Sequence, residues 1–512
     1  MGPRIDTVGF IVVLAFAGAA LAQTPAEPFV VPPTTLPAPA VPDPDALRTM
    51  IREELKAEQK KAEDTKATTS GSNFDLKSIA KNGFLAETED QAFRFHFGGR
   101  FDYDNAWFTQ DNNLLIGPSP GTRLQDGTDF RRARLRADGR VWDYIDFVAE
   151  VNFATIQDVT NPEAATVPVG SVGLVAFNLA FRDLPFGNLR VGLFKAPYGL
   201  ERYTSANVNY YMERSSIFDA FYNPNNIQSG LQFFDSYIDD RVTLTSTFTR
   251  VGKDTLNSFG FNAEDGLYAG GVRVTGLPIY EDDGRVLMHL GVSYYQQAFE
   301  GEKFSIANRL PLRAGAGSTD VPNLLATGSF FSPNGGSIVD GEWAMILGPF
   351  SMSAEYAIAS ISDVFEKFDG VRFSGPRGDA TYHAWYVEAG YFLTPGDRRR
   401  YDKPLGVWDR TVPEENAFLV ADDHGEWRHG SGAVEVVARL SYLDLVSGSP
   451  TLTPTSGGAR AGSQRDLTLG LNWYLNSQTR IMVNYVWTRL NSVVPGASGD
   501  IHGIGTRLHF DF

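Results

Sequence analysis

The sequence of 512 residues contains no cysteine and only seven histidines, which are scattered singly. The absence of cysteine excludes a disulfide scaffold, a thiolate metal site, a cysteine nucleophile and a lipidated N-terminal cysteine, but it leaves the compartment open. The net charge of −16 argues against broad nucleic-acid binding, because a phosphate backbone requires a basic protein face. We therefore expect no nucleic-acid partner.

Signals for catalysis and metal binding are weak. His424, Glu426 and His429 lie in DDHGEWRHG, but Gly425 breaks the helical register, so a surface loop is the better interpretation. No His-Glu-x-x-His helix is present. Abundant Asp and Glu without a placed pair are not evidence for glycoside hydrolysis. We expect no metal, no cofactor and no catalytic residue.

The N-terminus has the features of a secretory signal peptide. Arg4 precedes an apolar run from Gly9 to Ala22, and Ala20-Leu21-Ala22 before Gln23 has the small-x-small form that signal peptidase accepts. The alternative is a membrane anchor, but about 14 apolar residues fall short of the roughly 20 that a spanning helix needs. We predict cleavage of residues 1–22 and export.

Three segments precede the main domain. Residues 23–44 are rich in proline and predict a stiff, extended linker. In residues 45–66, Leu47, Ile51 and Leu55 recur every four positions and predict a short amphipathic helix. That helix forms either a parallel coiled coil with sister chains or a solvated helix that frays. Residues 67–90 are polar and predict a connector.

From residue 91 to the C-terminus the sequence alternates between apolar and polar residues. In FRFHFGGRFDYD, aromatic side chains share one parity with Phe93, whereas Arg94, Arg100 and Asp102 share the other. The alternating stretches run to about 10 or 12 residues, longer than the usual 5 to 6 of a soluble sandwich and long enough to cross a membrane. A closed barrel is then the spanning architecture that pairs every backbone group. We predict an all-β outer-membrane barrel over residues 91–512.

About sixteen strands are expected, with short turns at one end and long loops at the other. One connection departs from that rule: residues 394–431 are long where a short turn is expected. Either an elaboration lies there or the count is wrong by one pair. Residues 196–228 form a long connection with Lys195 at its mouth and Glu201, Arg202, Glu213 and Arg214 within it. This loop either folds into the pore or packs outward on a neighbouring subunit.

Parity also suggests an anion path. Arg132, Arg134, Arg136 and Arg140 share one face, and an arginine facing lipid near the midplane costs roughly 2 to 4 kcal/mol, so this face is expected to be luminal. Such a row can pass an oxyanion between guanidinium groups. The alternative is that carboxylates such as Glu150 neutralise these arginines and form a rigid lattice. The sequence leaves both possibilities open.

Several ordered blocks resemble a known family. They are FRRARLRADGRVWDYIDFVAEVNFA, LRVGLFKAPYGLERYTSANVNYYMERSSIFDAF, YFLTPGDRRRYDKPLGVW and RDLTLGLNWYLNSQTRIMVNYVW. They are similar to the successive signatures of the phosphate-selective porin O and P family. The resemblance implies a sixteen-stranded, trimeric outer-membrane channel, narrowed by inward loops and lined by basic residues.

The leading hypothesis is a channel for passive diffusion of small hydrophilic solutes that prefers anions such as phosphate, sits in outer-membrane lipid as a homotrimer and has its N-terminal extension in the periplasm. The candidate pore-lining and anion-binding residues are Arg94, Arg100, Arg132, Arg134, Arg136, Lys195, Arg202, Arg214 and Arg439. The alternatives are a structural barrel that tethers the envelope through its N-terminal helix, and a barrel enzyme with catalytic groups near the rim.

The exported protein is expected to begin at Gln23, because the small residues Ala20 and Ala22 mark the cleavage position. N-terminal sequencing of protein from the outer-membrane fraction checks this prediction. An intact N-terminus at Met1 on the exported protein would contradict it.

Overall fold

A computed structural model describes residues 75–77, 84–88, 92–112, 114, 123–154, 172–222, 227–250, 268–299, 303–313, 322–328, 330–368, 371–421, 427–446, 461–493 and 497–512. The predictions for residues 1–22, 23–44 and 45–66 lie outside these residues. Among the described residues, no helix is both long enough and apolar enough to cross a membrane.

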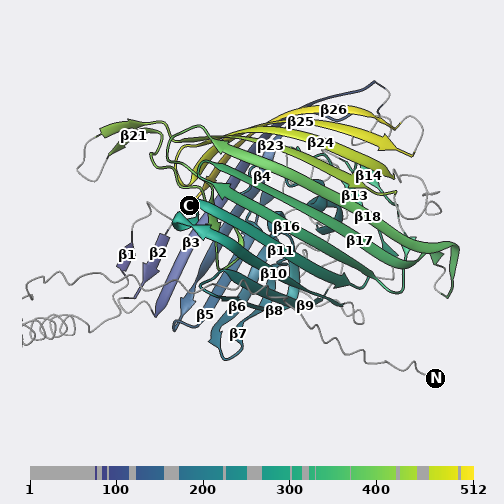
Figure 1. The fold of residues 1–512 in the computed structure, drawn as a ribbon, viewed down its shortest axis with the longest axis horizontal. Coiled ribbons are helices and arrows are strands. Elements are labelled where there is room, and N and C mark those ends of the chain that lie inside the picture. The colour runs from purple at the N-terminus through teal and green to yellow at the C-terminus, as the bar shows by residue number, and fades with distance from the viewer. Residues whose placement is uncertain are drawn as a thin grey trace, which may run out of the picture. The chain divides into compact units, whose positions relative to one another are not determined.

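Sixteen antiparallel strands form a closed barrel (Figure 1). The first eight are β3 (Phe93–Gln110), β4 (Gly127–Val141), β5 (Ile145–Asn152), β6 (Gly173–Leu184), β7 (Gly187–Lys195), β8 (Ile227–Tyr237), β9 (Val242–Arg250) and β10 (Tyr268–Glu281). The other eight are β11 (Val286–Gln297), β16 (Gly336–Leu347), β17 (Phe350–Phe368), β18 (Phe373–Phe392), β23 (Ala433–Asp444), β24 (Gly462–Tyr474), β25 (Thr479–Ser492) and β26 (Gly499–Asp511). The last strand pairs with the first, with Arg507 opposite Asp104, so the ring has no free edge. The predicted all-β barrel and its strand count are confirmed.

The two faces of the strands follow the predicted parity. On β24, Leu469 is 44% exposed on the outside, whereas its neighbour Thr468 is fully buried inside. On β26, Ile504 is 50% exposed and Arg507 only 2%. The outer surface is therefore apolar and the lumen is filled by polar and charged side chains, as a barrel in a bilayer requires.

A β-bulge interrupts the alternation on β4. Asp102 of β3 pairs with Arg132, but the next residue, Tyr103, pairs with Phe130, so Arg131 has no partner across the ladder. The extra residue brings Arg131 to the same side as Arg132, while Phe130 faces outward at 37% exposure. With strict alternation, Phe130 and Arg132 would lie on the same face of the sheet. The bulge places Phe130 on the opposite face.

Short elements decorate the barrel. β1 (Asp75–Lys77) and β2 (Phe84–Glu87) lie within the predicted connector 67–90, and β2 pairs with β3 alongside β26. Four small hairpin strands, β12 (Lys303–Phe304), β13 (Ala307–Asn308), β14 (Leu325–Ala326) and β15 (Phe330–Phe331), belong to the connection between β11 and β16. The helical turns are α2 (Leu200–Tyr203), η2 (Phe218–Tyr222) and η4 (Asp282–Gly284).

The long connection after β18 is an elaboration and not a missed strand pair. It contains β19 (Arg400–Asp402), β20 (Val407–Asp409), β21 (Phe418–Ala421) and β22 (Trp427–Gly430), which form two separate hairpins, while β18 pairs directly with β23. It lies at the end of the barrel that carries the short turns, here called the short-turn end; the opposite end is the long-loop end. The hairpin of β21 and β22 projects beyond the barrel wall (Figure 1).

Because the outer face of the barrel contacts lipid, the free-energy cost of a charged side chain there should depend on its depth in the membrane. Replacing Leu469 with arginine, near the middle of β24, should reduce the free energy of unfolding by about 2–4 kcal/mol. Val493, 43% exposed just beyond β25, is the matched control, and arginine there should cost only about 0–1 kcal/mol. Urea titration of the protein in lipid vesicles measures both; equal costs would contradict the proposed membrane band.

Candidate functional site

The connection between β7 and β8 folds into the lumen. Its residues 196–222, here called the inner loop, contact the inner wall on several strands. Leu200 N–H and Glu201 N–H donate to the carboxylate of Glu355 on β17, at 2.5 Å and 3.0 Å. The Tyr222 hydroxyl donates to Asp340 on β16 at 3.0 Å. Of the two arrangements that the sequence left open, the structure shows the inward one.

A glycine permits this close approach. Gly199 precedes α2 with φ of +77°, a conformation that other residues rarely adopt. A Cβ at this position would lie 2.9 Å from a carboxylate oxygen of Glu355 and 3.0 Å from one of Asp340. The chain can therefore turn against the acidic wall only where no side chain intervenes.

Glu213 is the main ionic junction of the inner loop. Its carboxylate accepts two bonds from Arg131 at 2.7 Å and 3.1 Å, and it pairs with Arg313 at 3.2 Å and with Arg507 at 3.3 Å. Burial raises the pKa of the Glu213 carboxyl, but Arg131 and Arg313 outweigh burial and hold that pKa well below its usual range. Glu213 is therefore an anion that three arginines share.

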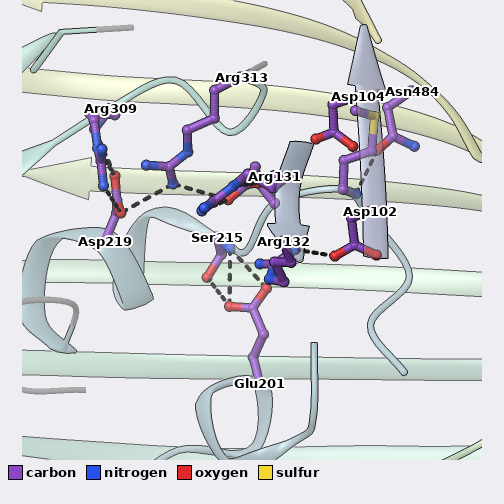
Figure 2. A network of polar contacts seen from close by, with 12 residues as sticks. Asp102, Asp104, Arg131, Arg132, Glu201, Ser215, Asp219, Arg309, Arg313 and Asn484 are labelled. Atoms are coloured by element: carbon purple, nitrogen blue, oxygen red, sulfur yellow. Dashed lines mark hydrogen bonds and ion pairs between the residues drawn. The ribbon is translucent and has the colours of Figure 1, made fainter. Parts of the chain in front are cut away.

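A second connection, between β11 and β16, is attached to the inner loop through the same network (Figure 2). Asp219 of the inner loop pairs with Arg309 at 3.4 Å and with Arg313 at 3.2 Å. Arg313 thus connects Asp219 to Glu213. Two loops from the long-loop end are joined inside the lumen by buried ion pairs.

Four of the predicted arginines pair with carboxylates of the barrel strands or the inner loop. Arg132 donates to Asp102 and Arg134 to Glu150, both at 2.9 Å. Arg136 bonds Asp138 at 2.7 Å and Glu150 at 3.3 Å. Arg439 donates to Glu201 at 3.0 Å and to the backbone oxygen of Glu213 at 3.1 Å. These contacts form the charge lattice that the sequence offered as the alternative to a free arginine row.

Other predicted cations are held by neutral groups. Lys195 donates to the backbone oxygen of Thr204 at 2.8 Å, and Arg214 donates to the backbone oxygens of Glu201 and Thr204 at 3.0 Å and 2.9 Å. Arg202 lies over the ring of Tyr222, 4.6 Å from its centre. Backbone oxygens and rings orient these cations and carry no negative charge of their own.

These cations are close enough to act on one another. Lys195 experiences the charges of Arg214, Arg202, Arg134 and Arg100. Arg100 stands opposite Arg134 across β3 and β4, and both are partly exposed. We call Arg100, Arg134, Lys195, Arg202 and Arg214 the central cation cluster. Within this cluster, the carboxylate of Glu150 pairs with Arg134. The carboxylate of Glu201 has the strongest electrostatic effect on Arg214.

Arg94 lies apart from this cluster. It is one of the residues around a cavity of about 600 Å³ at the short-turn end, together with Arg136 and Arg410. Arg94 pairs with Glu87 of β2 at 3.4 Å, and its side chain is 45% exposed. Arg410 comes from the elaboration after β18 and pairs with Asp511 at 2.6 Å. The nine predicted residues therefore lie in three places: the cavity at the short-turn end, the charge lattice of the wall and the central cation cluster.

Arg131 and Arg313 are luminal residues that the sequence pattern did not predict. Arg131 adjoins Arg132, and two consecutive arginines in an alternating strand were a possible signal of the bulge. Arg313 lies in a connection without periodicity, so nothing local marked it. Two residues of the weak metal candidate, His424 and Glu426, lie outside the described residues; among those described, no group of three ligating side chains is placed to hold a metal ion.

Replacing Glu213 with glutamine should destabilise the protein strongly, although the two side chains have nearly the same shape. Glu213→Gln keeps the shape but removes the anion that Arg131, Arg313 and Arg507 share, so the free energy of unfolding should fall by about 3–5 kcal/mol. Chemical denaturation measures it, and single-channel recordings should show a noisier current because the inner loop is released. Glu281→Gln, at an exposed strand end, is the control; equal stability of the two variants would refute the role of the junction.

Comparison with known proteins identifies the family of the chain. The chain is 26% identical over 469 residues to Porin O of Pseudomonas aeruginosa, covering 87% of this chain and 94% of that protein. Among solved structures it is similar to the outer-membrane channel DcaP of Acinetobacter baumannii, with 11% identity, a TM-score of 0.47, and 83% and 99% of the two chains covered. An anion-selective porin from Comamonas acidovorans gives 11% identity, a TM-score of 0.44, and 82% and 100% coverage. The model of the phosphate-selective porin O and P family matches residues 95–512, and the chain belongs to this family of outer-membrane porins.

Proposed function

We propose that this porin passes small oxyanions by passive diffusion and that the central cation cluster sets its preference for anions. The observation that carries the proposal is the environment of Lys195 and Arg214, whose charged groups are bonded to backbone oxygens. A cation bonded to neutral groups keeps its positive field in the lumen. Arg100 and Arg202 add to that field, whereas Arg134 is bonded to Glu150.

The net charge of −16 does not oppose this proposal. Selectivity depends on the charge at the narrowest part of the pore, because fields from distant surface charges are screened over about 10 Å in 0.1 M salt. The inner loop carries Arg202 and Arg214 into the lumen, and Lys195 lies at its first turn. Lys195 and Arg214 are therefore better placed to act on a passing solute than acidic residues on the outside, while the buried Arg202 acts only through its field.

The paired arginines have a different part in the proposal. Arg132, Arg136 and Arg439 are each bonded to a carboxylate, so their main contribution is to hold the wall and the inner loop in shape. Arg94 and Arg136, with Arg410, form a basic surface in the cavity at the short-turn end. An anion that leaves the cluster would meet this surface next. The assignment of all nine residues to anion binding stays a prediction.

The solute class is inferred from chemistry and from kinship. Guanidinium and ammonium groups are suited to phosphate and similar oxyanions. The family description names phosphate selectivity, which supports the same class. We also propose a homotrimer with the N-terminal extension in the periplasm, and no catalytic activity. Family membership favours a channel over the tethering barrel and the barrel enzyme.

Reversal potentials in a salt gradient test the proposal. The variant Lys195→Gln with Arg214→Gln should shift the reversal potential strongly toward cation preference, because it removes two positive charges that neutral groups hold. The matched control, Arg285→Gln with Arg398→Gln, removes two charges that carboxylates already pair at the short-turn end and outside the cavity, and it should shift the potential much less. An equal shift, or none in the cluster variant at normal conductance, would refute the assignment.

A further inference from the structure

Two arginines lie side by side on the outer surface of the barrel. Arg465 of β24 and Arg489 of β25 are direct register partners. Each alternates with buried inward residues, Asp466 at 3% and Thr488 at 0% exposure, so both arginines point away from the lumen. Like charges directly opposite each other on adjacent strands destabilise a sheet. This arrangement requires a compensating negative charge.

Protein groups compensate only one of the two. Arg489 donates to Asp500 of β26 at 3.0 Å. The contact described for Arg465 is the ring of Tyr442 on β23, 5.7 Å from the guanidinium carbon, and in the described part of the chain no carboxylate lies within ion-pair distance of it. The outward Asp444 accepts bonds from the backbone N–H of Val446 at 2.8 Å and from the Tyr442 hydroxyl at 3.4 Å. One guanidinium is therefore left with its charge unneutralised.

The position of the pair along the barrel is informative. Arg465 lies near the start of β24 and Arg489 near the end of β25, so both belong to the long-loop end. Two residues further toward the middle, about 6.6–6.8 Å away, Trp487 and Leu467 face the same side, followed by the exposed Leu469. The arginines thus stand at the border between the apolar band and water, the level at which lipid headgroups lie.

Aromatic and histidine side chains surround the pair. The ring of Tyr442 stacks near Trp385 at 6.0 Å, and His502, opposite Trp487, bonds the Tyr485 hydroxyl through Nδ1 at 2.8 Å. Amphipathic rings are enriched at the border of the membrane. Tyr442 on β23 and His502 on β26 thus lie on the strands that flank the two arginines.

We propose that Arg465 and Arg489 bind the phosphate headgroup of an anionic lipid in the outer leaflet. A phosphate between two facing guanidiniums accepts charge-assisted bonds from both and removes their repulsion. The acyl chains of that lipid lie along Leu467 and Leu469. This site is on the outer wall, separate from the pore, and it does not depend on which solute the channel carries.

The test is a lipid-retention measurement on the intact protein. Native mass spectrometry of the detergent-solubilised porin, titrated with bisphosphorylated lipid A, counts bound lipid; dephosphorylated lipid A is the matched probe. Wild-type protein should bind the phosphorylated form at least about tenfold more tightly, since one charge-assisted hydrogen bond accounts for that factor. Arg465→Gln should abolish the difference, whereas Arg465→Lys should keep part of it because the charge remains.

Arg285→Gln is the control variant. Arg285 lies in the turn between β10 and β11 at the short-turn end, and its side chain is 42% exposed, the same fraction as that of Arg489. It should bind phosphorylated lipid A as the wild type does. Excess inorganic phosphate should not displace the lipid, because the acyl chains contribute to binding.

Three outcomes would overturn the proposal. They are equal binding of the two lipid A forms by the wild type, unchanged binding by Arg465→Gln, and complete displacement by inorganic phosphate, which would indicate a site for the free ion. A fourth, weaker subunit association in Arg465→Gln with unchanged lipid binding, would assign the pair to contact with a neighbouring subunit.

Discussion

The arrangement of the lumen depends on one buried carboxylate. Glu213 pairs with Arg131 of the wall strand β4, Arg313 of the connection before β16, and Arg507 of the last strand. All four side chains are largely buried, and Arg507 and Arg313 have further carboxylate partners in Asp104 and Asp219, whereas the carboxylate bonded to Arg131 is that of Glu213. The same contact thereby fixes the inner loop, the second loop and the closure of the barrel.

The cations of the lumen divide by the kind of partner that they have. Arg132 and Arg136 are bonded to carboxylates, whereas Lys195 and Arg214 are bonded to backbone oxygens. A carboxylate offsets a positive charge, but a carbonyl dipole only orients it. The acids Asp340 on β16 and Glu355 on β17 accept hydrogen bonds from the inner loop and so hold it against the wall.

The lumen is also narrowed from the short-turn end. Arg399 of the elaboration after β18 lies over the ring of Tyr210 in the inner loop, 4.1 Å from its centre, and donates to the backbone oxygen of Val208. The backbone N–H of Trp408 donates to the hydroxyl of Thr204 at 3.4 Å. Segments from the two ends therefore meet inside the barrel. The connection at residues 394–431, which is long where a short turn was expected, therefore contacts the inner loop from the short-turn end.

The sequence by itself determined the barrel. Alternation with period two is a property of the strand backbone, and the cost of charge in lipid tells which face is outside, so the strands, their number and the luminal side of Arg132 and Arg134 follow without tertiary information. The inward course of residues 196–222 and the pairing of each arginine required the folded chain. A bulge shifted Arg131 out of the simple parity, and the partners of Glu213 lie as far away as Arg507. Local patterns fix which face a residue occupies, but contacts between distant segments decide which charges cancel and which remain.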